Sequence, residues 1–334
     1  MNTIKRAASS GFSLIELMIA MLIGLIILNG VIQVVISGKR TYLDNQAISQ
    51  IQENARYAIE TLSREIRVAG YIGCMTTANG ELDSAGVATA QPGFLVDGSN
   101  EFSALQAFNN VNAGNTGLPD QIRGSVREGT DVFIVRHTDT SSEWVLNNNL
   151  ASLGGSIQVG AGVEPKAGQP MALVSHDCAT ASLFTAGAVA DVDGGYSVTA
   201  TNANGSFGVS EFQKGSRLTP LVVYAYYIGI SSVVEDMPAL MREVIIMDGT
   251  TVSSRSEELA VGVEDMQITL GNDAAVFSEP VGNEVSPIAV RLELTLRSHS
   301  RVNGVAEGDG EGNGADDGYI RKVATATVRV RNQG

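Results

Sequence analysis

Histidine is scarce in this 334-residue chain, which narrows the chemistry that it can perform. The only imidazoles belong to His137, His176 and His299. His137 and His176 each end a short apolar run, where we expect them at the surface. The sequence has neither a Gly-x-Ser-x-Gly nucleophile elbow nor a His-Glu-x-x-His zinc motif. We therefore expect no enzyme activity and no catalytic residue.

Basic residues are also few, and they are unevenly distributed. The chain holds 22 basic and 36 acidic residues, a formal charge of −14. Residues 1–69 contain seven basic and five acidic side chains, whereas residues 70–334 contain 15 and 31. A region this acidic repels a phosphate backbone, so we expect no nucleic-acid binding. Apolar residues make up 44% of the chain, which is enough to build a core.

No proline precedes Pro92, so nothing of that kind interrupts a helix near the N-terminus. Residues 17–36 carry no charge, and twenty helical residues span about 30 Å, the thickness of a bilayer's hydrocarbon core. No small-residue cleavage site follows this run, which argues against a removable secretory signal. Two basic residues lie on each side of it, so the charges do not set its orientation. We predict a transmembrane helix.

An amphipathic pattern follows the apolar run. Its apolar residues recur every three or four positions, as in a helix with one buried face. They are Ala47, Ile48, Ile51, Ala55, Ile59, Leu62, Ile66 and Ala69. Gly70 is a natural C-terminal stop. One helix over residues 12–69 would be about 87 Å long, with a membrane and assembly part at 12–38 and an amphipathic stem at 39–70.

The chain has two cysteines, Cys74 and Cys178. Two thiols 104 positions apart, in a chain that also carries a membrane segment, fit one structural disulfide formed in an oxidising compartment. The alternatives are two buried free thiols, or a metal site that adds His176 and His137. Such a metal site would lack the close C-x2-4-C pair that is usual for zinc. We predict the disulfide.

The segment that leads into the apolar run, Ser-Ser-Gly-Phe-Ser-Leu-Ile-Glu-Leu-Met-Ile at residues 9–19, resembles the N-terminus of type IV prepilins. Gly11, Phe12 and Glu16 carry the resemblance together with the unbroken apolar helix. It implies that residues 1–11 are a leader peptide and that a prepilin peptidase cuts between Gly11 and Phe12. It also implies N-methylation of Phe12 and retention of the helix in the mature protein.

Glu16 lies one turn inside this apolar helix. A carboxylate near a bilayer centre costs roughly 2.5–3.5 kcal/mol, so such a residue usually has a partner. The resemblance implies that the partner is the N-terminal amine of a neighbouring subunit, which brings subunits into register during assembly. The alternative is a glutamate stabilised by the helix dipole and hydrated by headgroups. Many major pilins have a helix-breaking proline where this chain has Gln33, so the extent of unwinding in a filament stays open.

The sequence changes to a β-type pattern after residue 70. Residues 71–216 are rich in Gly, Ala, Asn, Ser and Thr, which predicts a loop-rich β head region with short strands and long loops. Residues 217–334 predict an antiparallel β-sheet head region, since the runs at 288–297 and 324–331 alternate apolar with polar residues. We expect their apolar faces to cover the helix stripe. The fold class is α+β and pilin-like: a long N-terminal α-helix, membrane-spanning in its first half, packed on an antiparallel β-sheet head with large loop insertions.

Four strings in and before this head resemble the PilW family of minor pilins, at residues 68–74, 175–178, 261–267 and 323–332. The resemblance implies a minor pilin that helps to initiate type IV pilus assembly and sits at the pilus tip. Its partners would be other minor pilins, the major pilin, the prepilin peptidase and the inner-membrane assembly platform. It would begin as a single-pass inner-membrane protein with a periplasmic head and end on the cell-surface pilus.

Two other functions stay open. Minor pseudopilins of type II secretion share the N-terminal signature, so capping of a pseudopilus is one alternative. The other is a tip adhesin or binding module that uses the loops between residues 76 and 215. The sequence leaves open whether a filament serves twitching motility, cell adhesion or DNA uptake.

An acidic, glycine-rich segment at residues 308–318 is the one candidate for a ligand site. Alternating oxygen donors followed by glycine fit the first half of an EF-hand calcium loop that begins at Asp309. The twelfth position of that loop is Ile320, where an EF-hand has a bidentate glutamate. The candidate ligands are Asp309, Glu311, Asn313, Asp316 and Asp317. The alternative is a hydrated, flexible loop between the last two strands. We expect no cofactor apart from this calcium site, which is a hypothesis.

Overall fold

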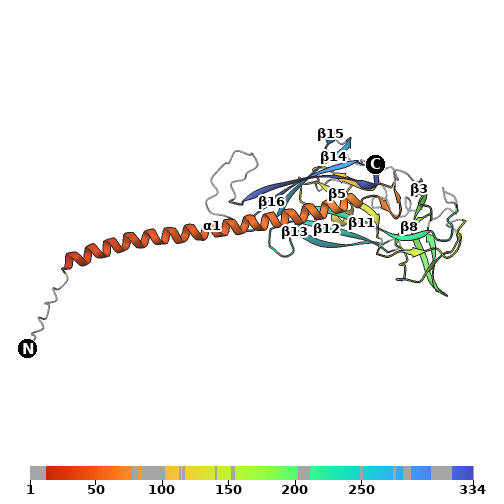
Figure 1. Cartoon of the computed structure of the whole chain (residues 1–334), viewed down its shortest axis with the longest axis horizontal. Coiled ribbons are helices and arrows are strands. Elements are labelled where there is room, and N and C mark those ends of the chain that lie inside the picture. Colours follow the sequence, from red (N-terminus) through yellow and green to blue (C-terminus); the bar gives the residue numbers. More distant parts are fainter. Residues whose placement is uncertain are drawn as a thin grey trace, which may run out of the picture. The chain divides into compact units, whose positions relative to one another are not determined.

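The computed structural model describes residues 13–76, 81–84, 102–112, 114, 117–139, 141–151, 155–201, 211–248, 251–273, 276–280, 287–301 and 318–333. The chain forms two compact units, one of residues 1–50 with 300–320 and one of residues 51–299 with 321–334. Helix α1 (Leu14–Val68) begins in the first unit and ends in the second. The second unit contains the β-sheets, so the α+β class predicted from the sequence is confirmed (Figure 1).

Helix α1 is 55 residues long and starts directly after Ser13. The backbone N–H of Ser13 donates to Glu16 Oε2 at 3.3 Å, which is one half of a capping box. The helix is followed by Gly70, whose φ of 72° is a left-handed conformation that glycine adopts without strain. The predicted C-terminal stop is therefore correct, whereas residue 12, where the predicted helix begins, lies outside the described residues.

The part of α1 in the second unit buries one face. Ile51, Ala58, Leu62 and Ile66 are each at most 3% exposed. Ala55 and Ile59, which belong to the predicted stripe, are only half-buried. Near its end the helix also buries polar side chains that the pattern did not indicate, namely Thr61, Ser63 and Glu65. The last two turns of α1 are therefore enclosed on more than one side.

Eleven strands form a large sheet. They are β3 (Glu81–Ser84), β4 (Leu105–Phe108), β5 (Val132–Thr138), β6 (Trp144–Val145), β7 (Ile157–Gly160), β8 (Pro170–Val174), β9 (Thr180–Val192), β10 (Gly195–Thr201), β11 (Arg217–Ile230), β12 (Pro238–Asp248) and β13 (Thr251–Val261). The main order is β13-β12-β11-β8-β9-β10-β7, while β5 pairs with β11 and β4, β6 pairs with β11, and β3 pairs with β9 in parallel. Strand β11 joins the two halves, because its first residues pair with β8 and its later ones with β5 and β12.

A second sheet has four strands in the order β15-β14-β16-β17. Their bounds are β14 (Val263–Asp273), β15 (Val276–Ser278), β16 (Ala289–Arg297) and β17 (Arg321–Arg329). The alternation at 288–297 and 324–331 predicts the β16–β17 pair, in which nine residues of each strand pair without a register shift. Shorter elements are the β1 (Tyr71–Ile72) and β2 (Met75–Thr76) hairpin, helix α3 (Asp120–Arg123) and the 3-10 turn η1 (Arg331–Gln333).

Gly262 connects the last strand of the large sheet to the first strand of the small one. Its N–H donates to Pro238 O at 2.7 Å and its carbonyl accepts from Arg297 N at 2.8 Å. With φ of 86°, a Cβ at this position would lie 2.8 Å from Arg297 O. Glycine is therefore required at the turn between the sheets.

Asp131 makes a second connection, between the start of β5 and the middle of β14. Its backbone N–H donates to Met266 O at 2.9 Å, and its carboxylate accepts from Ile268 N at 2.7 Å and from Asn110 N at 2.8 Å. Burial raises the pKa of Asp131 to about 6, although the two N–H groups oppose the rise. One side chain thus joins the two sheets where their strands do not pair.

The expectation that residues 71–216 contain only short strands is wrong for β9, which has 13 residues. β9 is rich in Ala and Thr and carries no strong strand pattern of its own, but β8 and β10 pair with it on both sides. Its Phe184 and Ala186 join a buried cluster that includes Trp144 and Phe212. Pairing and packing therefore decide the structure of this strand more than its local sequence.

Candidate functional site: the apolar helix and the end of α1

The apolar part of α1 is fully open in the first unit. Its large side chains from Leu14 to Ile36 are between 47% and 78% exposed. α1 contains the one helix segment in the described residues that is long and apolar enough to cross a bilayer. An apolar surface of this extent is expected to be covered by lipid or by other apolar helices.

Glu16 is the acidic residue of the first turn of α1. Its side chain is exposed, and in the single chain its partner is the backbone N–H of Ser13. This contact corresponds to the alternative in which the helix N-terminus stabilises the carboxylate. The predicted cleavage residues Gly11 and Phe12 lie outside the described residues.

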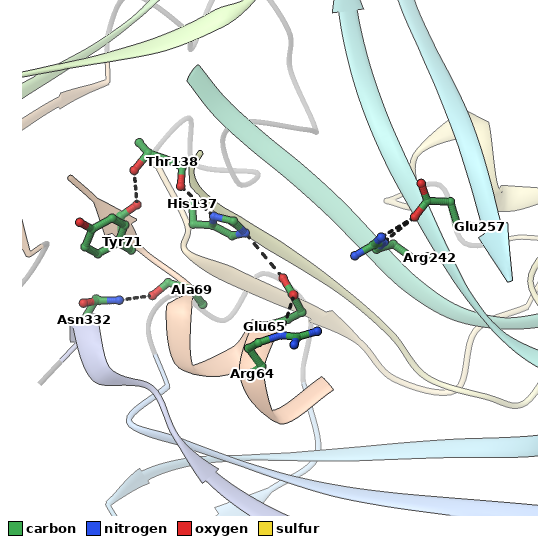
Figure 2. Close-up of polar contacts among 9 residues, drawn as sticks. All are labelled: Arg64, Glu65, Ala69, Tyr71, His137, Thr138, Arg242, Glu257 and Asn332. Carbon is green, nitrogen blue, oxygen red and sulfur yellow. Dashed lines mark hydrogen bonds and ion pairs between the residues drawn. The ribbon is translucent and has the colours of Figure 1, made fainter. Parts of the chain in front are cut away.

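Glu65 and His137 form an ion pair between the end of α1 and β5 (Figure 2). His137 Nε2 lies 3.6 Å from Glu65 Oε2, and His137 Nδ1 lies 3.0 Å from Thr138 O. Burial alone would raise the pKa of Glu65, but His137, Arg242 and Arg64 together hold it below its ordinary value. The side chain of His137 is 14% exposed, so the expectation that it lies at the surface is wrong.

The polar face continues from His137 across the large sheet. The His137 ring meets the Tyr224 ring edge-on, with centroids 5.6 Å apart, and Arg242 Cζ lies 5.1 Å from the centre of the same ring. Arg242 Nε donates to Glu257 Oε2 at 2.8 Å (Figure 2). Burial opposes the charge on Arg242, but the hydrogen bonds to Glu257 raise its pKa. No periodic pattern in the sequence indicates this row, since His137, Tyr224, Arg242 and Glu257 come from four separate elements.

The chain that leaves α1 is fastened to β5 by main-chain contacts. Gly70 N donates to Arg136 O at 2.9 Å, and Gly73 N donates to Thr138 Oγ1 at 3.1 Å. The hydroxyl of Thr138 in turn donates to Tyr71 O at 3.2 Å. At the other side of the helix end, Asn332 Nδ2 donates to Ala69 O at 3.1 Å (Figure 2). The C-terminal segment and β5 therefore both hold the end of α1.

Cys74 and Cys178 are joined by a disulfide, with their Cα atoms 5.4 Å apart. The bond links the β1–β2 hairpin to the turn between β8 and β9. In this turn Ser175 Oγ accepts from the N–H groups of Ala179 and Thr180 at 3.1 and 3.0 Å. Because both sulfurs are in the disulfide, the alternatives of free thiols and of a metal site built on Cys74 and Cys178 do not apply.

A recess of about 290 Å³ lies beside the Glu65–His137 pair. It is lined by Val68, Tyr71, His137, Thr138 and Asp139. Among the described residues, no group of three or more His, Cys, Asp and Glu side chains is placed to hold a metal ion. The proposed calcium ligands, from Asp309 to Asp317, lie outside the described residues.

Two family models match the chain. The model described as Type IV Pilus-assembly protein W matches residues 225–332, from within β11 to η1. The model described as prokaryotic N-terminal methylation motif matches residues 6–28. The first match contains the strings at 261–267 and 323–332, whereas those at 68–74 and 175–178 lie outside it. No curated protein and no solved structure matches the chain.

These matches point to a structural component of a pilus. The methylation motif and the apolar part of α1 together support a membrane-anchored pilin that interacts with other pilins and with the assembly machinery. With the β-sheets of the second unit, the two matches support the assignment of the chain to the type IV prepilin-like minor pilins.

Proposed function

We propose that this minor pilin helps to initiate type IV pilus assembly and sits at or near the pilus tip with other minor pilins. Before assembly, α1 would anchor it in the inner membrane with the β-sheets in the periplasm, after the prepilin peptidase has removed residues 1–11. The assembly platform and the major pilin would be its further partners. The protein would act by packing and charge pairing, without catalysis.

The observation that carries this proposal is the open apolar surface of α1. Burying one large apolar side chain contributes about 1.5–3 kcal/mol relative to leaving it exposed, so a surface of this extent needs apolar surroundings. A bilayer supplies them before assembly, and neighbouring apolar helices supply them in a filament. The same residues would therefore serve both states of the protein.

Glu16 would guide the change from one state to the other. Among the residues that the structure describes, its carboxylate accepts from the N–H of Ser13 at 3.3 Å. We propose that the N-terminal amine of Phe12 on a neighbouring subunit takes this place during assembly. A charged partner would make the contact stronger than a neutral amide can, and it would fix the axial position of adjacent helices.

The test is the amount of major pilin that can be sheared from cells lacking this gene, relative to the total cellular pool. We expect the sheared fraction to collapse while the total pool stays normal, and the wild-type gene to restore it. Glu16→Ala should fail to restore piliation at an unchanged protein level. Glu53→Ala is the matched control, because Glu53 is an exposed acid further along the same helix, and it should restore piliation.

Normal surface pili in the deletion strain would refute a role in initiation. If exported enzymes were then lost, the protein would act as a pseudopilin of type II secretion. If surface attachment fell instead, it would act as a tip adhesin.

A further inference from the structure

Strand β17 forms one end of the four-stranded sheet. On one side it pairs with β16 over nine consecutive residues. On its other side, no strand among the described residues pairs with it. In such an end strand, alternate residues direct their backbone N–H and C=O groups away from the sheet. β17 therefore offers a row of hydrogen-bonding groups to a further strand.

The other sheet ends are protected by devices that β17 lacks. β15 and β7 are short, with three and four residues. β13 has a register shift against β12, and its charged side chains lie in the middle of the strand, where they hinder the addition of a strand, whereas those of β17 lie at its ends. β17 has nine residues, a regular register and no proline, and its residues 323–328 carry no charge. Among β7, β13, β15 and β17, the strands at the ends of the two main strand orders, β17 is the best suited to accept a further strand.

The ends of β17 are basic, although the chain as a whole has a formal charge of −14. Lys322 and Arg329 flank the uncharged stretch, and both are exposed. Arg331 follows shortly after and is also exposed, and residues 319–333 contain no acidic side chain. A strand that pairs with β17 would therefore be favoured by carboxylates at its ends.

The same charges disfavour pairing between two copies of this chain. A symmetric antiparallel pair of β17 strands would place Arg321 of each copy opposite Arg329 of the other, because residues an even number of positions apart share one face of the strand. A parallel pair in register would place each basic residue beside its own counterpart. Like charges directly opposite each other destabilise a strand pair, so the charge pattern selects against self-association and in favour of a different chain.

We propose that the free side of β17 binds an extended segment of a different protein chain, with carboxylates at its two ends, as an additional strand of the sheet. Backbone hydrogen bonds would supply most of the affinity, and the basic residues at the ends would select the partner. This inference concerns a contact of the β-sheet and does not depend on a role in pilus initiation.

The test uses the purified full chain in detergent micelles and two synthetic peptides. Each peptide has six alternating Val and Thr residues, flanked at both ends by two Glu residues in one and by two Lys residues in the other. We expect the Glu peptide to slow amide hydrogen exchange in β17 but not in β13, and to bind more weakly as salt is raised. The Lys peptide should leave the exchange in β17 unchanged.

A pair of charge variants tests the role of the basic ends. Lys322→Glu with Arg329→Glu should weaken binding of the Glu peptide about tenfold, as expected for the loss of exposed charge pairs, and should favour the Lys peptide. Lys166→Glu with Lys214→Glu makes the same change of net charge at exposed loop residues of the large sheet. This control should bind the Glu peptide as the wild type does.

Three results would overturn the proposal. The first is exchange in β17 that the Glu peptide does not slow at millimolar concentration. The second is equal slowing by both peptides, which would remove the charge selection. The third is slow exchange along the free side of β17 in the protein alone, which would mean that this side is already covered.

Discussion

Asp131 provides the sharpest test of how the two sheets are held together. Its side chain is almost fully buried, and its pKa is raised from 3.8 to about 6, chiefly by burial. The native state therefore binds this proton more tightly than the unfolded state does. The resulting stabilisation is complete below pH 3.8 and is lost as the pH rises through about 6. The difference between the two pKa values corresponds to about 3 kcal/mol.

Asp131→Asn keeps the shape of the side chain but does not titrate. Its amide NH2 would face the N–H of either Asn110 or Ile268, which costs roughly 1–3 kcal/mol at every pH. We expect the wild type to be clearly more stable than the variant near pH 4. The free-energy gap should then shrink by up to about 3 kcal/mol by pH 7.5. Groups common to both proteins cancel in this difference.

The assay is urea unfolding of the full chain in detergent micelles, followed by fluorescence. Trp144 is the single tryptophan and is 4% exposed, so its emission reports on the core of the large sheet. A gap between wild type and Asp131→Asn that stays constant from pH 4 to 7.5, or widens, would refute the reasoning.

Three further substitutions, one of them with a matched control, test other parts of the second unit. Cys74→Ser removes the disulfide, whose stabilisation is about 4.7 kcal/mol for a loop of this length by chain-entropy reasoning. The substitution should therefore lower the protein's level in cells. Unchanged protease resistance under oxidising conditions would contradict this. Leu62→Ala, at a fully buried position of α1, should cost about 2–5 kcal/mol in urea unfolding, whereas Tyr57→Ala at a 49% exposed position of the same helix should change stability little. Glu65→Gln should destabilise the protein most near neutral pH. His137 and nearby arginines hold the pKa of Glu65 below 4.5 despite burial, so the stabilisation from this carboxylate is lost as the pH falls through the lowered pKa. A free-energy gap between wild type and variant that does not vary with pH would contradict this.

The sequence predicted those parts of the fold that depend on local patterns. The helix was predicted from the absence of proline and from the apolar repeat, and Gly70 marked its end. The β16–β17 pair was predicted because one face of each strand is apolar and the other polar. The family was indicated by a motif of fixed spacing around Glu16. In each case the residues that carry the information are close together in the chain.

The remaining features depend on residues that are far apart in the sequence. Asp131 bonds to Ile268, 137 positions away, and nothing near either residue indicates the contact. Glu65 adjoins the apolar stripe, and nothing near it in the sequence indicates its burial, because its partner His137 lies on β5. Strand β9 has a composition that favours loops, and its neighbours in the sheet impose the extended conformation. Long-range pairing of this kind leaves no periodic signal in one sequence.

The way in which the chain leaves α1 has a mechanical consequence. A pull along the helix would first load the hydrogen bonds of Gly70 and Gly73 to β5, and these can break. The tension would then reach Cys74, whose covalent bond to Cys178 passes it directly to the turn between β8 and β9. The chain between these two cysteines, which are 104 positions apart, cannot be drawn out, which withholds about 350 Å of extended chain at 3.3–3.6 Å per residue. A stretched subunit would therefore give way by only a few residues at the helix end before the load reaches β8 and β9, and the strands between the two cysteines would stay within the closed loop.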